Sequence, residues 1–121
     1  MQLTLDGHVV VFHDSSLLRL CGVEGRIQDL LYADLPPLLV PDTLCSSVAV
    51  TENPASSRIP LLLEVFQEFP HYPMQIDVKN GCERLVTLVG GYILEYERAQ
   101  YTVWYVNNTI DDAMYCLLSS L

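Results

Sequence analysis

Basic residues are scarce in this 121-residue chain, where six Lys and Arg stand against fifteen Asp and Glu and give a formal net charge of −9. A surface this acidic repels the phosphates of nucleic acids and anionic lipids, so we expect no nucleic-acid partner. A bound divalent cation would reverse the sign of the charge locally and allow a phosphate to bind. Lysine is scarcest of all, because Lys79 is the only one and it closes an apolar, strand-like run.

Long hydrophobic runs are also missing. No apolar stretch approaches the ~20 residues that a membrane helix needs, and no positively charged, apolar leader opens the chain. We therefore expect no membrane segment in this chain and a cytoplasmic location, with membrane association only if a further N-terminal segment exists. The four cysteines form no C-x-x-C pair, so we expect small, buried, free thiols rather than a metal site.

The first twelve residues predict a β-hairpin. Gln2–Thr4 and His8–Phe12 flank the tripeptide 5–7, and its Asp-Gly between β-prone segments is a strong hairpin signal. Residues 17–21 are a short segment, a turn follows over residues 22–25, and residues 27–32 predict a short helix. Residues 36–57 contain Pro, Ser, Thr and Asn without a clear period, so we expect a long irregular loop there.

The remainder of the chain predicts alternating helices and strands. Apolar residues recur at helical spacing from Ile59, and Pro60 is well placed for a first helical turn. The expected order is a helix over 59–69, a strand over 74–79, a helix over 85–96, a strand over 101–106 and a last helix from 109, which opens on a capping-box pattern. Such alternation builds a parallel sheet, so the fold class is α/β. Two and a half units of this kind cannot close a barrel and would expose sheet edges.

One histidine lies where a barrel enzyme places its chemistry. His13 ends the second strand of the predicted hairpin, and a histidine at the C-terminal end of a barrel strand is placed for acid/base work. From the dipeptide His13-Asp14 alone, a strand-end histidine that is merely hydrogen-bonded to its neighbour is the simpler interpretation.

Asp77 and Lys79 are two residues apart in a predicted strand. They therefore share one face, and Ile76 and Val78 share the other. A carboxylate and a lysine together suit metal binding and the stabilisation of phosphate charge, whereas the alternative is a half-buried ion pair. A charged pair inside a central strand is costly without a function, which favours the first interpretation.

Several ordered motifs resemble one family. The hairpin and its end resemble the signature that follows the second barrel strand of glycerophosphodiester phosphodiesterases, and the later segments extend the match in the right order. The details are most similar to the eukaryotic branch that acts as lysophospholipase D. The segments are Gln2-Leu3-Thr4-x-Asp6-Gly7-x-Val9-Val10-Val11-x-His13-Asp14, Leu18-Arg19, Leu35-Pro36-Pro37, Arg58-Ile59-Pro60-Leu61 through Phe69-Pro70, Ile76-Asp77-Val78-Lys79 and Tyr101-Thr102-Val103-Trp104.

The resemblance implies a partial (β/α)₈ TIM barrel of the phospholipase C-like phosphodiesterase type over residues 1–121. It would comprise roughly the second to fourth strand units, with an N-terminal β-hairpin. The implied activity is hydrolysis of glycerophosphodiesters or lysophospholipids in lipid metabolism, with Ca²⁺ or Mg²⁺ as the cofactor. By the same resemblance, His13 is a catalytic acid/base, Asp77 a metal ligand, Lys79 a catalytic residue that contacts the phosphate, and Arg19 a substrate-binding residue.

The family's His-Arg-Gly and Glu-x-Asp motifs precede the position of Met1 in the family pattern and do not occur in this sequence. We therefore expect the 121-residue chain to be inactive by itself, as a fragment or truncated form. Two alternatives remain open. The chain could be a non-catalytic isoform that self-associates or binds partners through its exposed sheet edges. It could also be a small independent α/β binding module.

Overall fold

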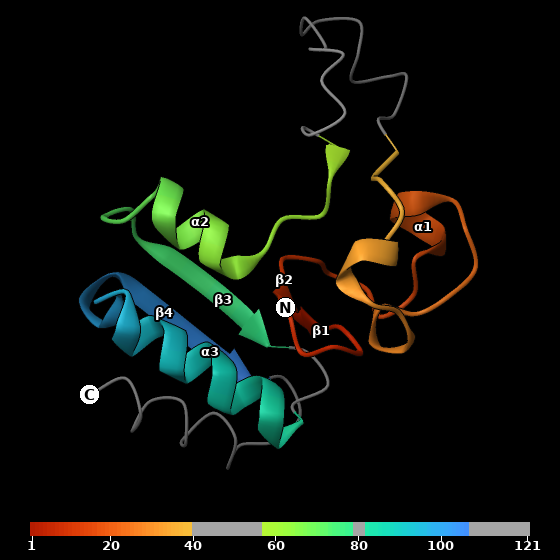
Figure 1. Ribbon diagram of the computed structural model, residues 1–121. Coiled ribbons are helices and arrows are strands. Elements are labelled where there is room, and N and C mark those ends of the chain that lie inside the picture. Colours follow the sequence, from red (N-terminus) through yellow and green to blue (C-terminus); the bar gives the residue numbers. More distant parts are fainter. Residues whose placement is uncertain (40–56, 79–81, 107–121) are drawn as a thin grey trace, which may run out of the picture.

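The computed structural model describes residues 1–39, 57–78 and 82–106. In these ranges a hairpin and a short helix precede a helix–strand–helix–strand unit (Figure 1). The elements are β1 (Gln2–Leu3), β2 (Val9–Val10), α1 (Leu18–Cys21), α2 (Leu62–Glu68), β3 (Met74–Val78), α3 (Glu83–Glu95) and β4 (Thr102–Val106). The helix expected from residue 109 and most of the long loop lie outside the described residues.

The predicted hairpin is present. β1 and β2 pair antiparallel, with Gln2 opposite Val10 and Leu3 opposite Val9. Its turn needs a glycine, because Gly7 has a φ of 85°, in the region that L side chains rarely adopt. The second edge of the hairpin is also used, since Val10 forms an antiparallel bridge with Leu61. The hairpin is therefore fixed to the segment that leads into α2.

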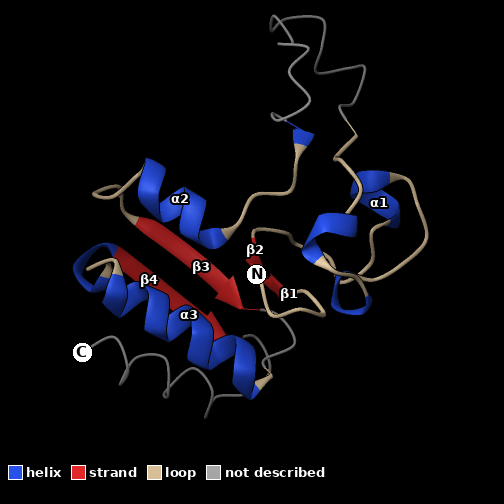
Figure 2. Cartoon of the chain, in the orientation of Figure 1, coloured by secondary structure: helices blue, strands red, loops and turns tan. Residues whose placement is uncertain are grey.

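β3 and β4 form a two-stranded parallel sheet, as the alternation of helices and strands predicts. Figure 2 shows α2 and α3 packed along this sheet. Both helices contribute to one hydrophobic core with the sheet face that carries Ile76 and Trp104. The prediction that Ile76 and Val78 share the apolar face of β3 is confirmed, because both residues are buried. On the opposite face, Gln75 and Val103 are exposed and lie side by side in the register.

A second hydrophobic cluster lies beneath α1 and joins the hairpin to the segment around residue 59. It holds Val10, Phe12, Leu17, Cys21, Ile27 and Ile59. Because Val9 belongs to the first cluster and Val10 to this one, the hairpin connects the two cores. β2 is thus anchored from both sides, and Phe12, the neighbour of His13, is buried in the second cluster.

The start of α2 is later than expected. The sequence predicts helical spacing from Ile59 and a first turn at Pro60, but Leu61 has extended dihedral angles and the helix begins at Leu62. The reason is tertiary, because the Pro60 carbonyl accepts a hydrogen bond from the Val11 amide (2.9 Å). The Glu64 carboxylate then accepts from the Leu61 amide (3.1 Å) and caps the helix.

Two further local expectations were wrong. Residues 27–32 form no single helix but two 3₁₀ turns, Ile27–Asp29 and Tyr32–Asp34, with extended residues between them. The Leu30 carbonyl there accepts from the Leu5 amide (2.9 Å), so the hairpin turn interrupts the helix. Tyr101 belongs to a 3₁₀ turn rather than to β4, because its amide donates to the Arg98 carbonyl (3.0 Å).

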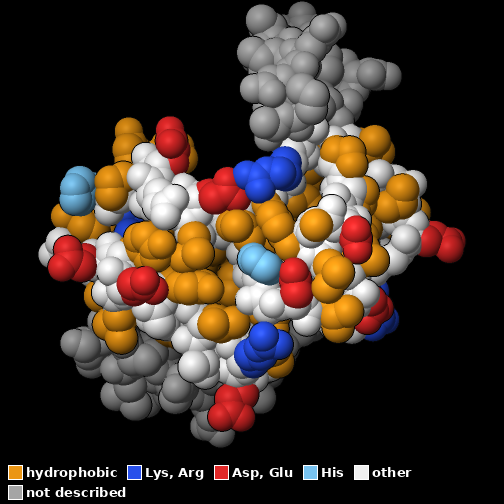
Figure 3. Space-filling view, viewed as in Figure 1, with side chains coloured by type: hydrophobic (Ala, Val, Ile, Leu, Met, Phe, Trp, Pro, Cys, Tyr) orange, Lys and Arg blue, Asp and Glu red, His pale blue; other side chains and the backbone are white. Residues whose placement is uncertain are grey.

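The surface mixes charged and apolar side chains, and hydrophobic ones gather between α2 and α3 in Figure 3. Of the two cysteines in the described ranges, Cys21 is buried as expected, but Cys82 is exposed. Cys82 is exposed because it is the N-cap of α3, where its Sγ accepts from the Leu85 amide (3.4 Å). None of the helices in the described ranges is both long and apolar enough to cross a membrane.

Candidate active site

His13 and Asp77 line the same groove, although 64 positions separate them in the chain. The groove has a volume of about 520 Å³, and most of its remaining lining is apolar. Those lining residues are Met1, Val11, Phe12, Leu20, Leu38 and Leu39. His13 reaches the groove from the segment that follows β2, three residues beyond its last residue, and Asp77 reaches it from β3. The structure therefore brings together two of the residues that the sequence singles out.

The imidazole of His13 is held by its neighbour. Its Nδ1 lies 2.6 Å from Oδ1 of Asp14, and the side chain of His13 is 67% exposed. The backbone carbonyl of His13 accepts a hydrogen bond from Nε2 of Gln2 (3.1 Å), which is buried in β1. The histidine is thus fixed at its backbone and at one ring nitrogen, while the rest of the ring stays accessible to a ligand.

Arg19 binds the same carboxylate. Its Nε donates to Oδ2 of Asp14 (2.8 Å) and its Nη2 to Oδ1 (2.9 Å), a two-pronged pair. The hydrogen bonds from Arg19, and next from His13, hold the pKa of Asp14 well below its usual range. In turn, Asp14 raises the pKa of Arg19. Arg19 and His13 therefore contact the same carboxylate, and Asp14 engages two of the three guanidinium nitrogens of Arg19.

Asp77 lies half-buried near the end of β3. Its Oδ1 atom is buried, and its backbone carbonyl accepts a hydrogen bond from the Met1 nitrogen (2.6 Å). The start of the chain is therefore placed against the strand that carries the predicted metal ligand. Lys79, the partner that the sequence assigns to the same strand face, lies outside the described residues.

The described residues do not form a complete metal site. No group of three or more His, Cys, Asp or Glu side chains in ranges 1–39, 57–78 and 82–106 is placed to hold an ion. Calcium takes six to eight oxygen ligands, and magnesium needs near-octahedral coordination. Among the described residues that line the groove, Asp77 is the one carboxylate, which is too few for such an ion.

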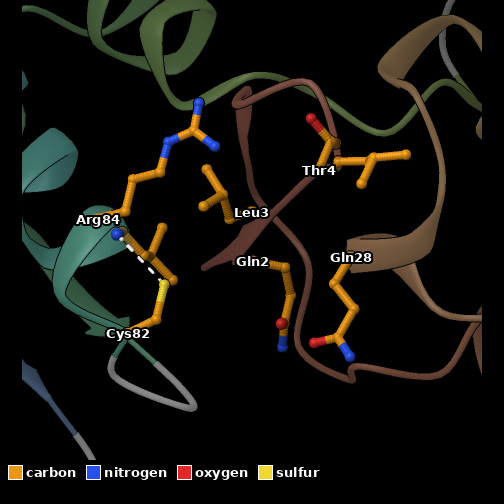
Figure 4. A pocket seen from close by; sticks show the side chains of 8 residues that line it. Gln2, Leu3, Thr4, Gln28, Cys82 and Arg84 are labelled. Atoms are coloured by element: carbon orange, nitrogen blue, oxygen red, sulfur yellow. Dashed lines mark hydrogen bonds between the residues drawn. The ribbon is translucent and has the colours of Figure 1, made fainter.

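A second cavity, of about 260 Å³, lies between β1 and the start of α3. Figure 4 shows its polar side chains, with the guanidinium of Arg84 pointing away from the amides of Gln2 and Gln28. Leu3 lies between these polar groups. They do not converge on one point, so this cavity lacks the arrangement that a catalytic site needs.

Comparison with known proteins identifies the family. The sequence profile of the glycerophosphoryl diester phosphodiesterase family matches residues 1–91. The chain belongs to this family, and it resembles the eukaryotic lysophospholipase D-like branch in particular.

Individual relatives support the assignment to this branch. The chain is 39% identical over 114 residues to lysophospholipase D GDPD1 of Mus musculus. This match covers 93% of this chain and 36% of that protein. The chain is 32% identical over 103 residues to lysophospholipase D GDPD3 of Homo sapiens, covering 85% of this chain and 32% of that protein. A glycerophosphodiester phosphodiesterase of Caldanaerobacter subterraneus is 30% identical over 104 residues, and the match covers 78% of this chain and 40% of that protein. The chain thus spans about a third of the length of these relatives.

Proposed function

We propose that this chain supplies one wall of a phosphodiesterase site that hydrolyses lysophospholipids or related glycerophosphodiesters. The observation that carries the proposal is the groove that His13 and Asp77 share. An accessible histidine shortly after one strand and a carboxylate near the C-terminal end of another resemble the arrangement on which barrel enzymes build their chemistry. Under this proposal, the described elements correspond to the second to fourth strand units of a TIM barrel.

Each candidate residue has a distinct role in this proposal. His13 takes or gives a proton at the scissile diester, which suits an exposed imidazole held at one nitrogen. Asp77 would provide one carboxylate ligand to a Ca²⁺ or Mg²⁺ ion, and the ion would supply positive charge next to the phosphate. Lys79 stabilises the charge that develops on the phosphate. Arg19 contacts the substrate through Nη1, the guanidinium nitrogen that Asp14 does not engage.

We expect no hydrolysis by the 121-residue chain on its own. The sequence has neither a His-Arg-Gly nor a Glu-x-Asp motif, so a second histidine and the paired carboxylates of the family pattern are missing. Purified chain with Ca²⁺ or Mg²⁺ should release choline and lysophosphatidate from lysophosphatidylcholine, or choline and glycerol 3-phosphate from glycerophosphocholine, only at the background rate. If the chain releases product above background and EDTA abolishes this release, the 121 residues suffice for hydrolysis and the expectation is wrong.

The apolar lining of the groove favours a substrate with an acyl chain. Ligand sites are mostly apolar, with a few polar groups that orient the ligand, and Leu38 and Leu39 line this groove together with His13 and Asp77. Each methylene that a chain buries improves affinity, by about fourfold at full burial. A lysophospholipid should therefore bind more tightly than glycerophosphocholine, which has the same headgroup without the chain.

A substitution at Leu39 tests this preference. Leu39→Gln should weaken the binding of a short-chain, monomeric lysophosphatidylcholine by about threefold to tenfold and leave glycerophosphocholine unaffected. Leu94→Gln on α3 is the matched control, because Leu94 and Leu39 are similarly exposed, at 65% and 60%. Calorimetric titration of each variant measures the affinity for lysophosphatidylcholine and for glycerophosphocholine. Equal losses for the two variants would place the acyl chain elsewhere.

A second function is favoured by the sheet itself. In the part of the chain that the structure describes, β3 and β4 pair only with each other, and Val103 is 64% exposed on the uncovered face. Strand edges of this kind pair readily with another chain. We propose self-association as the alternative, in which the chain acts as a non-catalytic interaction protein. Size-exclusion chromatography decides, because a discrete folded dimer supports it and a folded monomer contradicts it.

A further inference from the structure

The side chains of His13, Asp14 and Arg19 form a continuous series of contacts beside the groove. Nδ1 of His13 lies 2.6 Å from Asp14, and Asp14 accepts two hydrogen bonds from Arg19 at 2.8 and 2.9 Å. Arg19 and Asp14 are five positions apart, so the fold between them must bring them together. The series ends in the one ring of the groove that can transfer a proton.

The backbone between these residues is well fixed. Arg19 lies in α1, whose neighbours Leu17 and Cys21 are buried in the second core. The Leu17 amide donates to the Gly25 carbonyl (2.9 Å), and Ser16 forms a bridge with Arg26. Because both ends of α1 are anchored, the guanidinium is presented to Asp14 from a fixed position.

The charge on Asp14 dictates which nitrogen of His13 carries the proton. An ionised carboxylate only accepts hydrogen bonds, and the two bonds from Arg19 keep Asp14 ionised. A contact of 2.6 Å between Nδ1 and this carboxylate therefore requires a hydrogen on Nδ1. In the neutral ring, Nε2 is then the nitrogen with the lone pair. A neutral histidine side chain without such a partner favours the opposite tautomer.

We propose that Asp14 and Arg19 are positioning residues, which hold His13 in its Nδ1–H tautomer and so reserve Nε2 for proton transfer. This inference rests on the proposed role of His13 in hydrolysis. When Nε2 takes a proton, the ring becomes an imidazolium, and the adjacent carboxylate stabilises its charge. When Nε2 returns the proton, the ring is neutral again with the hydrogen still on Nδ1. Arg19 acts one step further away, because it fixes the oxygens that face the ring.

The test reads the tautomer directly in the 121-residue chain, without any need for activity. Long-range ¹H–¹⁵N NMR spectra at about pH 8.5, well above the ordinary histidine pKa, distinguish protonated from unprotonated ring nitrogens. His13 should be mainly Nδ1–H. Asp14→Ala should move it to mainly Nε2–H, and Arg19→Gln should lower the Nδ1–H population at least about twofold, with partial rescue by Arg19→Lys.

The other two histidines supply controls. His8 has its own carboxylate neighbour, Asp6, at 3.2 Å, so Asp6→Ala should change the spectrum of His8 and not that of His13. His71 contacts the Tyr101 ring and should respond to none of these variants. Asp14→Asn keeps the side-chain volume and replaces Asp14→Ala if circular dichroism shows that the alanine variant does not fold. It should also reduce the Nδ1–H population.

Two results would overturn the inference. A wild-type His13 that is mainly Nε2–H would refute the role of Asp14. An Arg19→Gln chain that melts at a lower temperature with an unchanged tautomer would make Arg19 a purely structural residue. Neither result bears on whether the groove binds a phosphodiester, because the proposed function is tested by ligand binding and product release.

Discussion

An alanine at position 13 is expected to lower turnover by about 10²- to 10⁴-fold, the range that a general acid or base contributes. The measurement needs the missing motifs, so the chain is placed in a chimera. Its residues replace the segment that they match in lysophospholipase D GDPD1 of Mus musculus, with which they are 39% identical. The chimera supplies the remaining segments of the relative, so the proposed role of His13 is tested in a protein of full length.

The matched control in the same chimera is His71→Ala. His71 is exposed and lies outside the residues that line the groove. It should leave kcat within about twofold, because surface substitutions away from the site have small effects. Lysophospholipid affinity should hold in both variants, since His13 is assigned to proton transfer rather than binding. An active His13→Ala chimera would remove the histidine from the mechanism.

Arg98→Ala is expected to lower the free energy of unfolding by about 4 kcal/mol, because it removes a buried side chain and leaves three backbone carbonyls without this donor. Arg98 is fully buried, with 0% of its surface exposed. Its Nη1 donates to the carbonyls of Phe69 (2.8 Å) and Pro70 (2.7 Å), and its Nη2 donates to the carbonyl of Tyr72. Arg98 therefore supplies hydrogen-bond donors to the backbone carbonyls of the turn that joins α2 to β3.

The aromatic contacts of Arg98 add to this effect. Its guanidinium lies 5.2 Å from the centroid of the Phe66 ring and 5.6 Å from that of Tyr101. Arg98→Lys keeps the charge but loses the planar fork, so it should cost about half as much as alanine. Arg26→Ala, at an exposed arginine, is the control and should cost less than about 0.5 kcal/mol. Urea unfolding measures the free energy of unfolding of all three variants. Similar unfolding midpoints for Arg98→Ala and Arg26→Ala would show that Arg98 is dispensable for stability.

The sequence predicted the elements whose signals are local. The Asp-Gly turn specifies the hairpin, and β-branched and apolar spacing specifies β3, α3 and β4 and their parallel order. It also predicted that His13 and Asp77 belong to one site, through the family resemblance, and the shared groove agrees with this. Lys79 stays a prediction, because it lies outside the described residues.

The features that the sequence did not predict depend on contacts between distant segments. The start of α2 is set by a hydrogen bond to Val11, and the break near Leu30 is set by the hairpin turn. The burial of Arg98 could not be read from composition, since arginine is mostly a surface residue. Gln2 shows the same difficulty, because only the folded hairpin places its amide on the backbone of His13.

The contact between His13 and Asp14 had a signal in the sequence, because the two residues are neighbours. The dipeptide His13-Asp14 suggested a plain strand-end hydrogen bond, and that bond is present (2.6 Å). Nothing in the local pattern indicates that Arg19 binds the same carboxylate, because the pairing depends on the turn of the chain through α1. The hydrogen bond and the catalytic role are therefore compatible rather than exclusive.

The most direct test maps where a phosphodiester touches the chain. A ¹⁵N-labelled 121-residue chain is titrated with short-chain lysophosphatidylcholine below its micelle concentration. The account predicts that the ring nitrogens of His13 and the backbone amide of Asp77 shift together and saturate at one affinity. Shifts confined to the cavity around Arg84, or a ligand that moves only one of the two signals, would show that His13 and Asp77 do not share a substrate site.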